Sequence, residues 1–253
     1  MGIFIEEFTT GLIINEVTTL VLVVLFLMVA LIYKYLKDSA PSETSRRIYR
    51  YLFLAWLFFT LTYALLFIRN LILDEAINIW INKIDTSITA IGALFLYMFL
   101  GELYGSEKPK KIITALGIFE AIVATITYMF WPGFDAKPTE FGLEVIPPKT
   151  VLLIVLALIL LIIVIFLFTA AYLGIKTEKP ELRKRIISVS ISYTIWWIFQ
   201  LIEAGGILVE LLGGIGMIIT RAVLSILAFV IIYVWVGKEK FLEAVRGALH
   251  LAR

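Results

Sequence analysis

Seven long apolar stretches, separated by short polar connections, dominate the pattern of hydrophobic and polar positions along the chain. Each stretch is long enough to cross about 30 Å of hydrocarbon as one helix. The stretches run Gly11 to Leu36, Ile48 to Leu73, Asn78 to Tyr104, Ile112 to Trp131, Lys149 to Ile175, Ile186 to Val209 and Gly214 to Val236. The pattern predicts an all-α membrane bundle, with seven transmembrane helices in one domain over residues 1–236 and an amphipathic cytoplasmic tail over residues 237–253.

Basic residues are concentrated on alternate connections, and this asymmetry predicts the orientation of the bundle. Of the 22 lysines and arginines, 17 lie beside the first, third and fifth connections or in the C-terminal tail. They are Lys34, Lys37, Arg46, Arg47, Arg50, Lys108, Lys110, Lys111, Lys176, Lys179, Arg183, Lys184, Arg185, Lys238, Lys240, Arg246 and Arg253. Cytoplasmic loops carry an excess of Lys and Arg. We therefore expect a multi-pass protein of the cell membrane, with its N-terminus outside and its C-terminus in the cytoplasm.

Composition supports a membrane protein and removes several chemistries. The chain is 61% hydrophobic and 17% charged, with a mean hydropathy of +1.00, which would leave a soluble fold with much exposed apolar surface. It has no cysteine and one histidine, His250, which excludes thiol chemistry, a His-based metal site and a Ser/His triad within the membrane. We expect no enzyme activity, no metal, no covalent cofactor and no nucleic-acid partner, whereas a non-covalent chromophore or lipid stays compatible with the sequence.

Two segments outside the apolar stretches contain their own patterns. Residues 132–148 are rich in Gly and Pro and contain a short alternation from Phe141 to Ile146; we expect a plain loop there, with a β-hairpin over the outer mouth as the alternative. The tail places five apolar residues on one helical face, which predicts an interfacial helix on anionic lipid, or alternatively a docking helix for a signalling partner. These five are Phe241, Val245, Ala248, Leu249 and Ala252.

Ionisable residues inside the apolar stretches are the candidates for function, because hydrocarbon disfavours them unless they pair or line water. Counting about 1.5 Å per residue from the helix ends places Glu16, Arg69, Asp85, Glu203 and Arg221 in one outer layer facing the interior. We expect Glu203 to pair with Arg221, because a few residues join the sixth and seventh spans as antiparallel neighbours. The layer is either a functional cavity or an ion-pair network that only ties the helices together.

Glu120 stands apart from this layer, near the middle of the fourth span. In the interior of the bundle it would be protonated, and it could then relay a proton towards Glu102 near the inner face. The alternative is one neutral acid that is hydrogen-bonded to a neighbouring hydroxyl group.

Aromatic and hydroxyl side chains surround the predicted charged layer on the second, third and sixth spans. A cavity with aromatic walls and a few polar groups is typical of a small-molecule site in a helix bundle. These side chains are Trp56, Phe59, Tyr63, Phe67, Thr86, Ser87, Thr89, Tyr193, Trp196, Trp197, Phe199 and Gln200. The fifth span, Val151 to Phe168, has no ionisable residue, and we expect it to be peripheral and to contribute little to the site.

Asp85 and Thr89 lie four residues apart on the third span, and Tyr193, Trp197 and Glu203 follow one another on the sixth. This arrangement resembles the microbial rhodopsin family, whose third helix carries a counter-ion Asp with a Thr four residues later. In that family a Tyr and a Trp of the sixth helix line the retinal ring, and an acidic residue follows near the outer end. The resemblance implies a seven-helix fold and a ligand site at these five positions.

The seventh span departs from the rhodopsin pattern, because it contains no lysine and reads Leu224, Ser225, Ile226 where the Schiff-base residue would fall. Retinal therefore cannot bind covalently there. Thr220 and Arg221 replace an acidic residue of the family, Thr86 replaces the Trp after the counter-ion, and the aromatic lining of the fifth span is absent. We hypothesise that Arg221 faces Asp85 and Glu203 and fills the electrostatic role of the imine.

The topology also resembles the seven-helix membrane input modules of bacterial and archaeal signalling proteins. We expect no output domain after Arg253, so signalling would use a separate cytoplasmic partner at the basic connections and the tail.

Three functions remain: a receptor or sensor with a small ligand in the outer layer, a proton-coupled transporter, and a scaffold subunit of a membrane complex. Carriers commonly show internal repeats and broken helices. The sequence has no clear repeat, and its 7 prolines all lie in the predicted connections, which favours the receptor.

Overall fold

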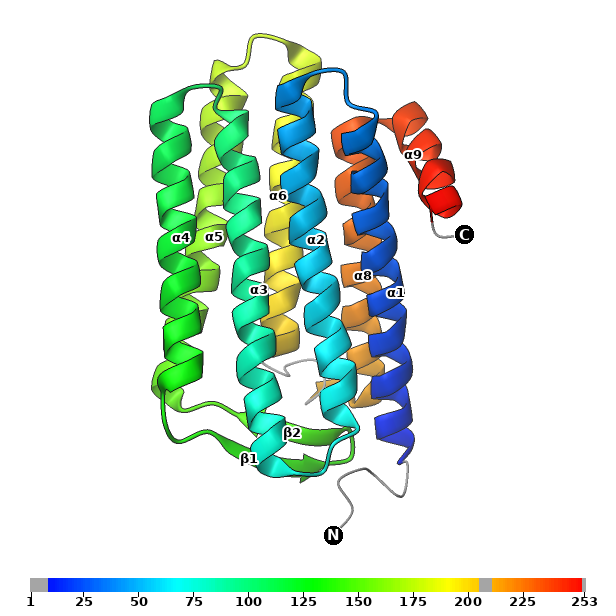
Figure 1. Cartoon of the computed structure of the whole chain (residues 1–253), viewed down its shortest axis with the longest axis vertical. Coiled ribbons are helices and arrows are strands. Elements are labelled where there is room, and N and C mark those ends of the chain that lie inside the picture. The colour runs from blue at the N-terminus through cyan, green and yellow to red at the C-terminus, as the bar shows by residue number, and fades with distance from the viewer. Residues whose placement is uncertain (1–8, 205–210, 252–253) are drawn as a thin grey trace.

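The computed structural model describes residues 9–204 and 211–251, and within these ranges seven helices are long and apolar enough to cross a membrane. The prediction of a multi-pass, seven-helix membrane protein is therefore confirmed (Figure 1). The seven helices are α1 (Thr10–Asp38), α2 (Glu43–Asn70), α3 (Glu75–Leu103), α4 (Glu107–Phe130), α5 (Lys149–Lys176), α6 (Pro180–Ala204) and α8 (Gly214–Val236).

Several helices begin before their apolar stretches, at polar capping residues. The Ser42 side chain accepts a hydrogen bond from the backbone N–H of Ser45, so α2 begins at Glu43 rather than near Ile48. The Asp74 carboxylate caps α3 in the same way through the N–H of Ile77. Such caps satisfy N–H groups that have no partner within the helix, and the connections are correspondingly short.

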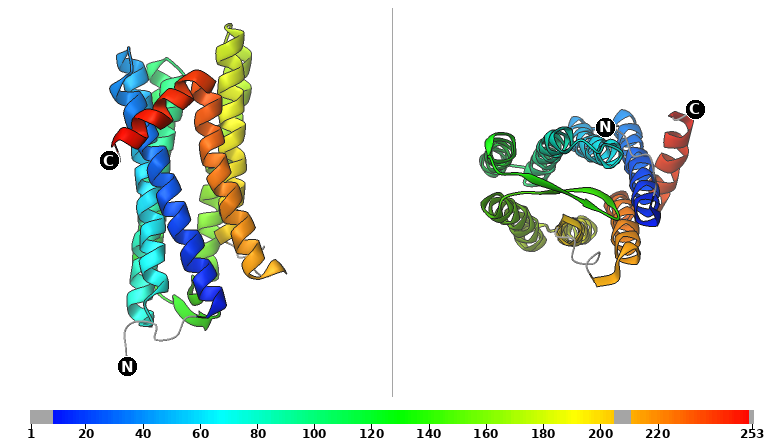
Figure 2. Two further views of the ribbon diagram at one scale, coloured as in Figure 1. Left: turned by 90° about the vertical axis from the view of Figure 1, so that its right-hand side faces the viewer. Right: turned by 90° about the horizontal axis from the view of Figure 1, so that it is seen from below.

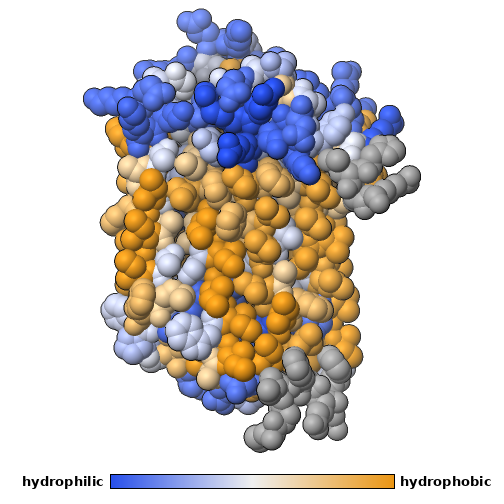
Figure 3. Space-filling model, viewed as in Figure 1, coloured by the Kyte–Doolittle hydropathy of each residue, from blue (hydrophilic) through white to orange (hydrophobic). Residues whose placement is uncertain are grey.

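The helices form a ring in which neighbours in the chain lie side by side and α8 closes against α1. Seen along the bundle, α1 to α4 form one curved row and α5, α6 and α8 form the facing row (Figure 2). The inner faces of the ring enclose the core, and the outer faces expose many large apolar residues. Figure 3 shows the resulting apolar belt, with hydrophilic residues gathered at the end of the bundle that carries the α2 N-terminus.

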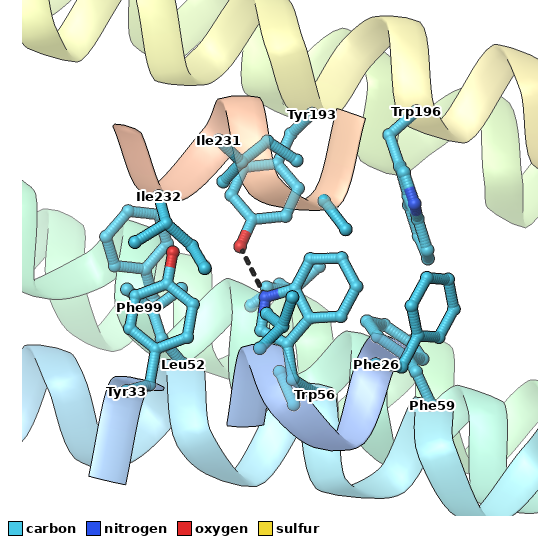
Figure 4. Packing of buried hydrophobic residues seen from close by; sticks show 14 of the residues in the cluster. Phe26, Tyr33, Leu52, Trp56, Phe59, Phe99, Tyr193, Trp196, Ile231 and Ile232 are labelled. Carbon is cyan, nitrogen blue, oxygen red and sulfur yellow. Dashed lines mark hydrogen bonds between the residues drawn. The ribbon is translucent and has the colours of Figure 1, made fainter. Parts of the chain in front are cut away.

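Aromatic side chains fill the space between the two rows (Figure 4). Trp196 of α6 contacts the ring of Trp56 on α2 at a centroid distance of 5.5 Å. The indole N–H of Trp56 donates to the Tyr193 hydroxyl at 3.3 Å. Phe166 of α5 stacks on Tyr193 at 5.0 Å and is fully buried. The expectation that the fifth span supplies no aromatic lining was therefore wrong, because Phe166 faces inwards and packs against Tyr193.

A β-hairpin follows α4, formed by β1 (Asp135–Thr139) and β2 (Gly142–Ile146) in antiparallel pairing. The expectation of a plain loop was wrong, and the alternative is the one observed. The hairpin lies across one end of the ring (Figure 2), where the Asn15 side-chain amide of α1 donates to the Phe141 carbonyl at 2.7 Å. We call this the hairpin end. This hydrogen bond attaches the hairpin turn to α1.

The helix α9 (Lys238–Leu251) follows α8 at the opposite end and packs back against α1 (Figure 1). Ala244 and Ala248 are fully buried, and the Tyr35 hydroxyl of α1 donates to Glu243 at 3.1 Å. Leu249, of the predicted apolar face, is half exposed, and Ala252 lies outside the described residues. The small side chains therefore face the bundle.

Candidate functional site

Arg221 is the centre of a buried polar cluster near the hairpin end. Its side chain, on α8, is almost enclosed, and the residue is 6% exposed. The Nε–H donates to Glu203 Oε1 of α6 at 3.0 Å. The Nη1 group donates to three oxygens of α1: the Asn15 carbonyl at 2.8 Å and the hydroxyls of Thr18 at 2.7 Å and Thr19 at 2.6 Å. One guanidinium thus joins α1, α6 and α8, and the expected pairing of Glu203 with Arg221 is confirmed.

The second oxygen of Glu203 extends the cluster to α2. The Tyr63 hydroxyl donates to Glu203 Oε2 at 2.6 Å, and the Gln200 amide donates to the Tyr63 oxygen at 3.1 Å. Both carboxylate oxygens of Glu203 are therefore satisfied by donors from different helices. Bonds between charged groups and good donors are roughly twice as strong as neutral ones, so this contact holds four helices in one arrangement.

Asp85 forms a second ion pair with Arg69, at 3.7 Å between Arg69 Nη1 and Asp85 Oδ2. The Thr86 hydroxyl donates to the other oxygen of Asp85 at 3.1 Å. One turn further along α3, Thr89 lies 2.9 Å from the Thr62 hydroxyl and donates to the Asp85 backbone carbonyl at 2.9 Å. This second pair joins α2 to α3.

The hypothesis that Arg221 faces both Asp85 and Glu203 was therefore half right. Arg221 pairs with Glu203, whereas Asp85 forms its ion pair with Arg69. The physical reason is the order of helices in the ring, since α2 is the neighbour of α3 while α8 lies between α6 and α1. Each carboxylate pairs with the arginine of an adjacent helix.

Glu16 is the third carboxylate of the predicted layer and has no such partner. It is 8% exposed, and neither oxygen makes a hydrogen bond with another described residue. We use the name polar layer for the residues of this region near the hairpin end. They are Glu16, Tyr63, Arg69, Asp85, Gln200, Glu203 and Arg221. Within the described residues, no group of three or more His, Cys, Asp or Glu side chains is placed to hold a metal ion.

Glu120 lies away from the polar layer, and the Tyr97 hydroxyl of α3 donates a hydrogen bond to its Oε2. Glu102, the residue considered as the next step of a proton relay, lies 2.8 Å from Lys110 Nζ and 3.4 Å from Arg47 Nε. Both carboxyl groups are thus held by neighbouring side chains. The structure provides the neighbouring hydroxyl group for Glu120 that the alternative interpretation requires.

The six residues predicted to bind a ligand fall into three separate groups. Glu203 and Arg221 contact each other, and Asp85 and Thr89 lie on α3 beside α2. Tyr193 and Trp197 are buried within the aromatic core. Because Tyr193 precedes Glu203 by ten residues on α6, about 15 Å of helix separates them. The structure therefore brings the charged residues close to the hairpin and leaves the aromatic pair in the packed interior.

The partners that α1 supplies to Arg221 escaped the sequence analysis. Thr18 and Thr19 look like ordinary polar residues of an apolar helix. Their signal is weak but present, because Asn15 and Thr19 share the buried helical face of Glu16 and Leu12. Tyr97, the partner of Glu120, was likewise missed, since nothing in the sequence sets the register between α3 and α4.

No model of a known protein family matches the chain, and no curated protein sequence matches it either. The geometry of the polar layer therefore carries the functional proposal.

Proposed function

We propose that the chain is a seven-transmembrane receptor- or sensor-like protein, in which a small ligand binds in the polar layer and changes the contact between Glu203 and Arg221. The observation that carries this proposal is the buried Arg221, whose bonds reach α1 and α6 at once. A buried ion pair that loses one partner leaves an uncompensated charge. A ligand that competes for either side chain therefore favours a different arrangement of the helices.

The charge distribution supports the orientation of this receptor. The connections between α1 and α2, α3 and α4, and α5 and α6, together with α9, carry most of the basic residues. By the positive-inside rule, we place the hairpin end and the N-terminus outside the cell membrane and α9 in the cytoplasm. A ligand then arrives from outside, and a cytoplasmic signalling partner would bind at the basic connections and α9.

The resemblance to microbial rhodopsins enters this proposal as a charge arrangement without covalent retinal. Arg221 takes the place of a fixed cation opposite Glu203, and Asp85 is already paired with Arg69. Tyr193 contacts Phe166 and Trp56, which occupy the space beside it. This packing favours a small polar ligand of the polar layer over a retinal-sized molecule in the core.

The transport and scaffold alternatives have less support from particular contacts. A proton relay needs Glu120 and Glu102 to exchange protons with successive partners. Glu102 is instead held between two cations, Lys110 and Arg47. A scaffold subunit would not require a buried ion pair such as that of Glu203 and Arg221.

The test is native mass spectrometry of the detergent-purified protein, before and after addition of a panel of small acids, amines, lipids and retinal. We expect a small molecule to be retained or captured by the wild type and lost from Arg221→Gln and Glu203→Gln. Arg46→Gln, which alters an exposed pair with Glu43, is the control and should keep the ligand. An absence of any bound molecule, together with proton flux in liposomes that stops in Glu120→Gln, would overturn the receptor proposal.

A further inference from the structure

The polar layer has more carboxylates than cations among its described residues. Glu203 is neutralised by Arg221 and Asp85 by Arg69. Glu16 lies near Arg221, yet the hydrogen bonds of that guanidinium go to Glu203 and to α1 oxygens. The layer therefore lacks one positive charge, and the deficit falls on Glu16.

Glu16 is enclosed rather than turned towards solvent. The residue is 8% exposed, and both oxygens are buried without a hydrogen-bond donor among the described residues. Its polar neighbour Asn70, at the end of α2, is 2% exposed, and its buried amide lies close enough to interact with the Glu16 carboxylate, although not in hydrogen-bond geometry. A buried carboxylate without a compensating charge is strongly disfavoured. A positively charged group that donates to this carboxylate would remove that cost.

The hairpin closes over this position. Leu12 lies one helical turn from Glu16, about 6 Å nearer to the hairpin end. A side-chain carbon built on Gly142 of β2 would lie 3.4 Å from Leu12 Cδ1 and 3.5 Å from the Asn70 carbonyl oxygen. Gly142 has a φ of 113°, a conformation that favours glycine. The hairpin, α1 and the end of α2 thus meet about one helical turn from Glu16, on the side of the hairpin end.

We propose that Glu16 anchors the ligand of the polar layer, and that this ligand carries an organic ammonium group with N–H donors. Charge-assisted hydrogen bonds from such a group would satisfy the carboxylate and supply the missing positive charge. The Asn70 amide beside the carboxylate could then donate to an acceptor oxygen of the ligand, such as the hydroxyl of an amino alcohol. This inference rests on the proposed receptor function and adds the chemical class of its ligand.

Ethanolamine is the probe for this site, tested by thermal unfolding and calorimetry on the full chain in detergent. We expect stabilisation that increases with ethanolamine concentration. Choline, which has the charge but no N–H donor, should bind at least about tenfold more weakly, and ethylene glycol and glycolate should not stabilise the protein. Stabilisation by sodium ions that equals that of ethanolamine would overturn the ammonium proposal.

Glu16→Gln is the decisive variant, with Glu140→Gln as its control. Glu140 is an exposed carboxylate at the hairpin turn, so its replacement removes one negative charge from the same end of the bundle. We expect the affinity for ethanolamine to fall at least about tenfold in Glu16→Gln and to stay unchanged in Glu140→Gln. Equal affinity in wild type and Glu16→Gln overturns the proposal. So does an infrared band of a protonated carboxyl group that is present in wild type with ethanolamine and absent from Glu16→Gln.

Three results separate this inference from the receptor proposal. Ethanolamine phospholipid in nanodiscs, if it stabilises the protein where free ethanolamine does not, supports the Glu16 site with a lipid headgroup as the source. Arg221-dependent binding of an acid, without binding of ethanolamine, would overturn the ammonium ligand and leave the receptor standing. Glu16-dependent binding of ethanolamine that moves no helix would support the site and contradict the receptor.

Discussion

At the scale of the residue, Arg221 shows why a guanidinium rather than an ammonium group fits the centre of the polar layer. It directs its Nε–H to a carboxylate and its Nη1 group to a carbonyl and two hydroxyls. The planar group offers five donors in fixed directions, whereas a lysine offers one compact charge. The contact therefore specifies one arrangement of α1, α6 and α8.

Arg221→Gln should lower the free energy of unfolding by about 3 kcal/mol, because it leaves the Glu203 carboxylate without its cation. The double variant Glu203→Gln/Arg221→Gln should recover part of this loss, since it removes both charges together. Unfolding of the detergent-purified variants, followed as a double-mutant cycle, measures both quantities. An unchanged melting temperature in Arg221→Gln would contradict the placement of the cluster.

Glu120→Gln should change stability by less than about 1 kcal/mol, because a glutamine oxygen can still accept the Tyr97 hydrogen bond. Glu120→Leu should be less stable than Glu120→Gln, since it leaves the buried Tyr97 hydroxyl without its acceptor. Thermal unfolding of the two variants beside Tyr97→Phe measures the difference. Equal losses in Glu120→Gln and Glu120→Leu would show that the hydrogen bond contributes nothing.

The sequence predicted which residues form the polar layer better than it predicted which of them contact one another. Glu203 and Arg221 could be paired from the sequence because a short connection makes their helices antiparallel neighbours with the two residues level. Asp85 offered two arginines at a similar depth, and only the order of helices in the ring selects Arg69. The isolation of Glu16 depends on side-chain directions that no spacing along the chain defines.

At the scale of the element, glycine sets the approach of α3 to α4. A side-chain carbon built on Gly117 would lie 2.6 Å from Tyr97 Cβ, too close for any real contact. Small residues at such positions let transmembrane helices approach closely.

Gly117→Ala should therefore destabilise the protein by about 1–3 kcal/mol through overpacking. Gly101→Ala is the matched control, because its added carbon would meet Lys110 at an ordinary 3.4 Å, and it should be neutral or slightly stabilising. Thermal unfolding of both variants checks the pair. Equal losses would argue against the close contact of Gly117 with Tyr97.

Asn15→Ala should loosen the hairpin without removing the Arg221 contacts, because Arg221 bonds to the backbone carbonyl of Asn15. We expect faster amide hydrogen exchange over residues 135–146, measured by mass spectrometry. Asn82→Ala is the control, since the Asn82 side chain makes no hydrogen bond with another described residue. Unchanged exchange in Asn15→Ala would mean that the bond to Phe141 does not hold the hairpin.

The seven helices could be predicted because each apolar stretch is far longer than a β-strand would need. Their ends were less so, since capping by Ser42 and Asp74 extends α2 and α3 through polar residues. The hairpin was only the alternative prediction because its alternation is short and Pro138 lies in β1, which removes one backbone donor. Its contacts with α1 are tertiary and therefore invisible in the local pattern.

At the scale of the whole molecule, the ring has a hairpin at one end and basic connections with α9 at the other (Figures 1 and 2). This asymmetry gives the proposed receptor an entry side and a signalling side. The polar layer lies towards the entry side. A rearrangement of its contacts therefore reaches the basic connections by movement of whole helices.

The orientation predicts which cysteines a membrane-impermeant thiol reagent can label in intact cells. The chain has no cysteine, so the introduced cysteine is the one residue of each variant that the reagent labels. We expect Glu140→Cys, in the hairpin turn, to be labelled from outside, and Glu181→Cys, at the start of α6, to be labelled only after the cells are opened. The reverse pattern would place the N-terminus in the cytoplasm.

The central claim is that the Glu203–Arg221 contact selects the arrangement of the helices. Spin labels at Glu43→Cys and Glu181→Cys, on the exposed starts of α2 and α6, report this arrangement at the end opposite the hairpin by pulsed electron resonance. We predict that Arg221→Gln and Glu203→Gln each shift the distance distribution without any ligand, whereas Glu140→Gln leaves it as in wild type. An identical distribution in wild type and in both variants would contradict the claim.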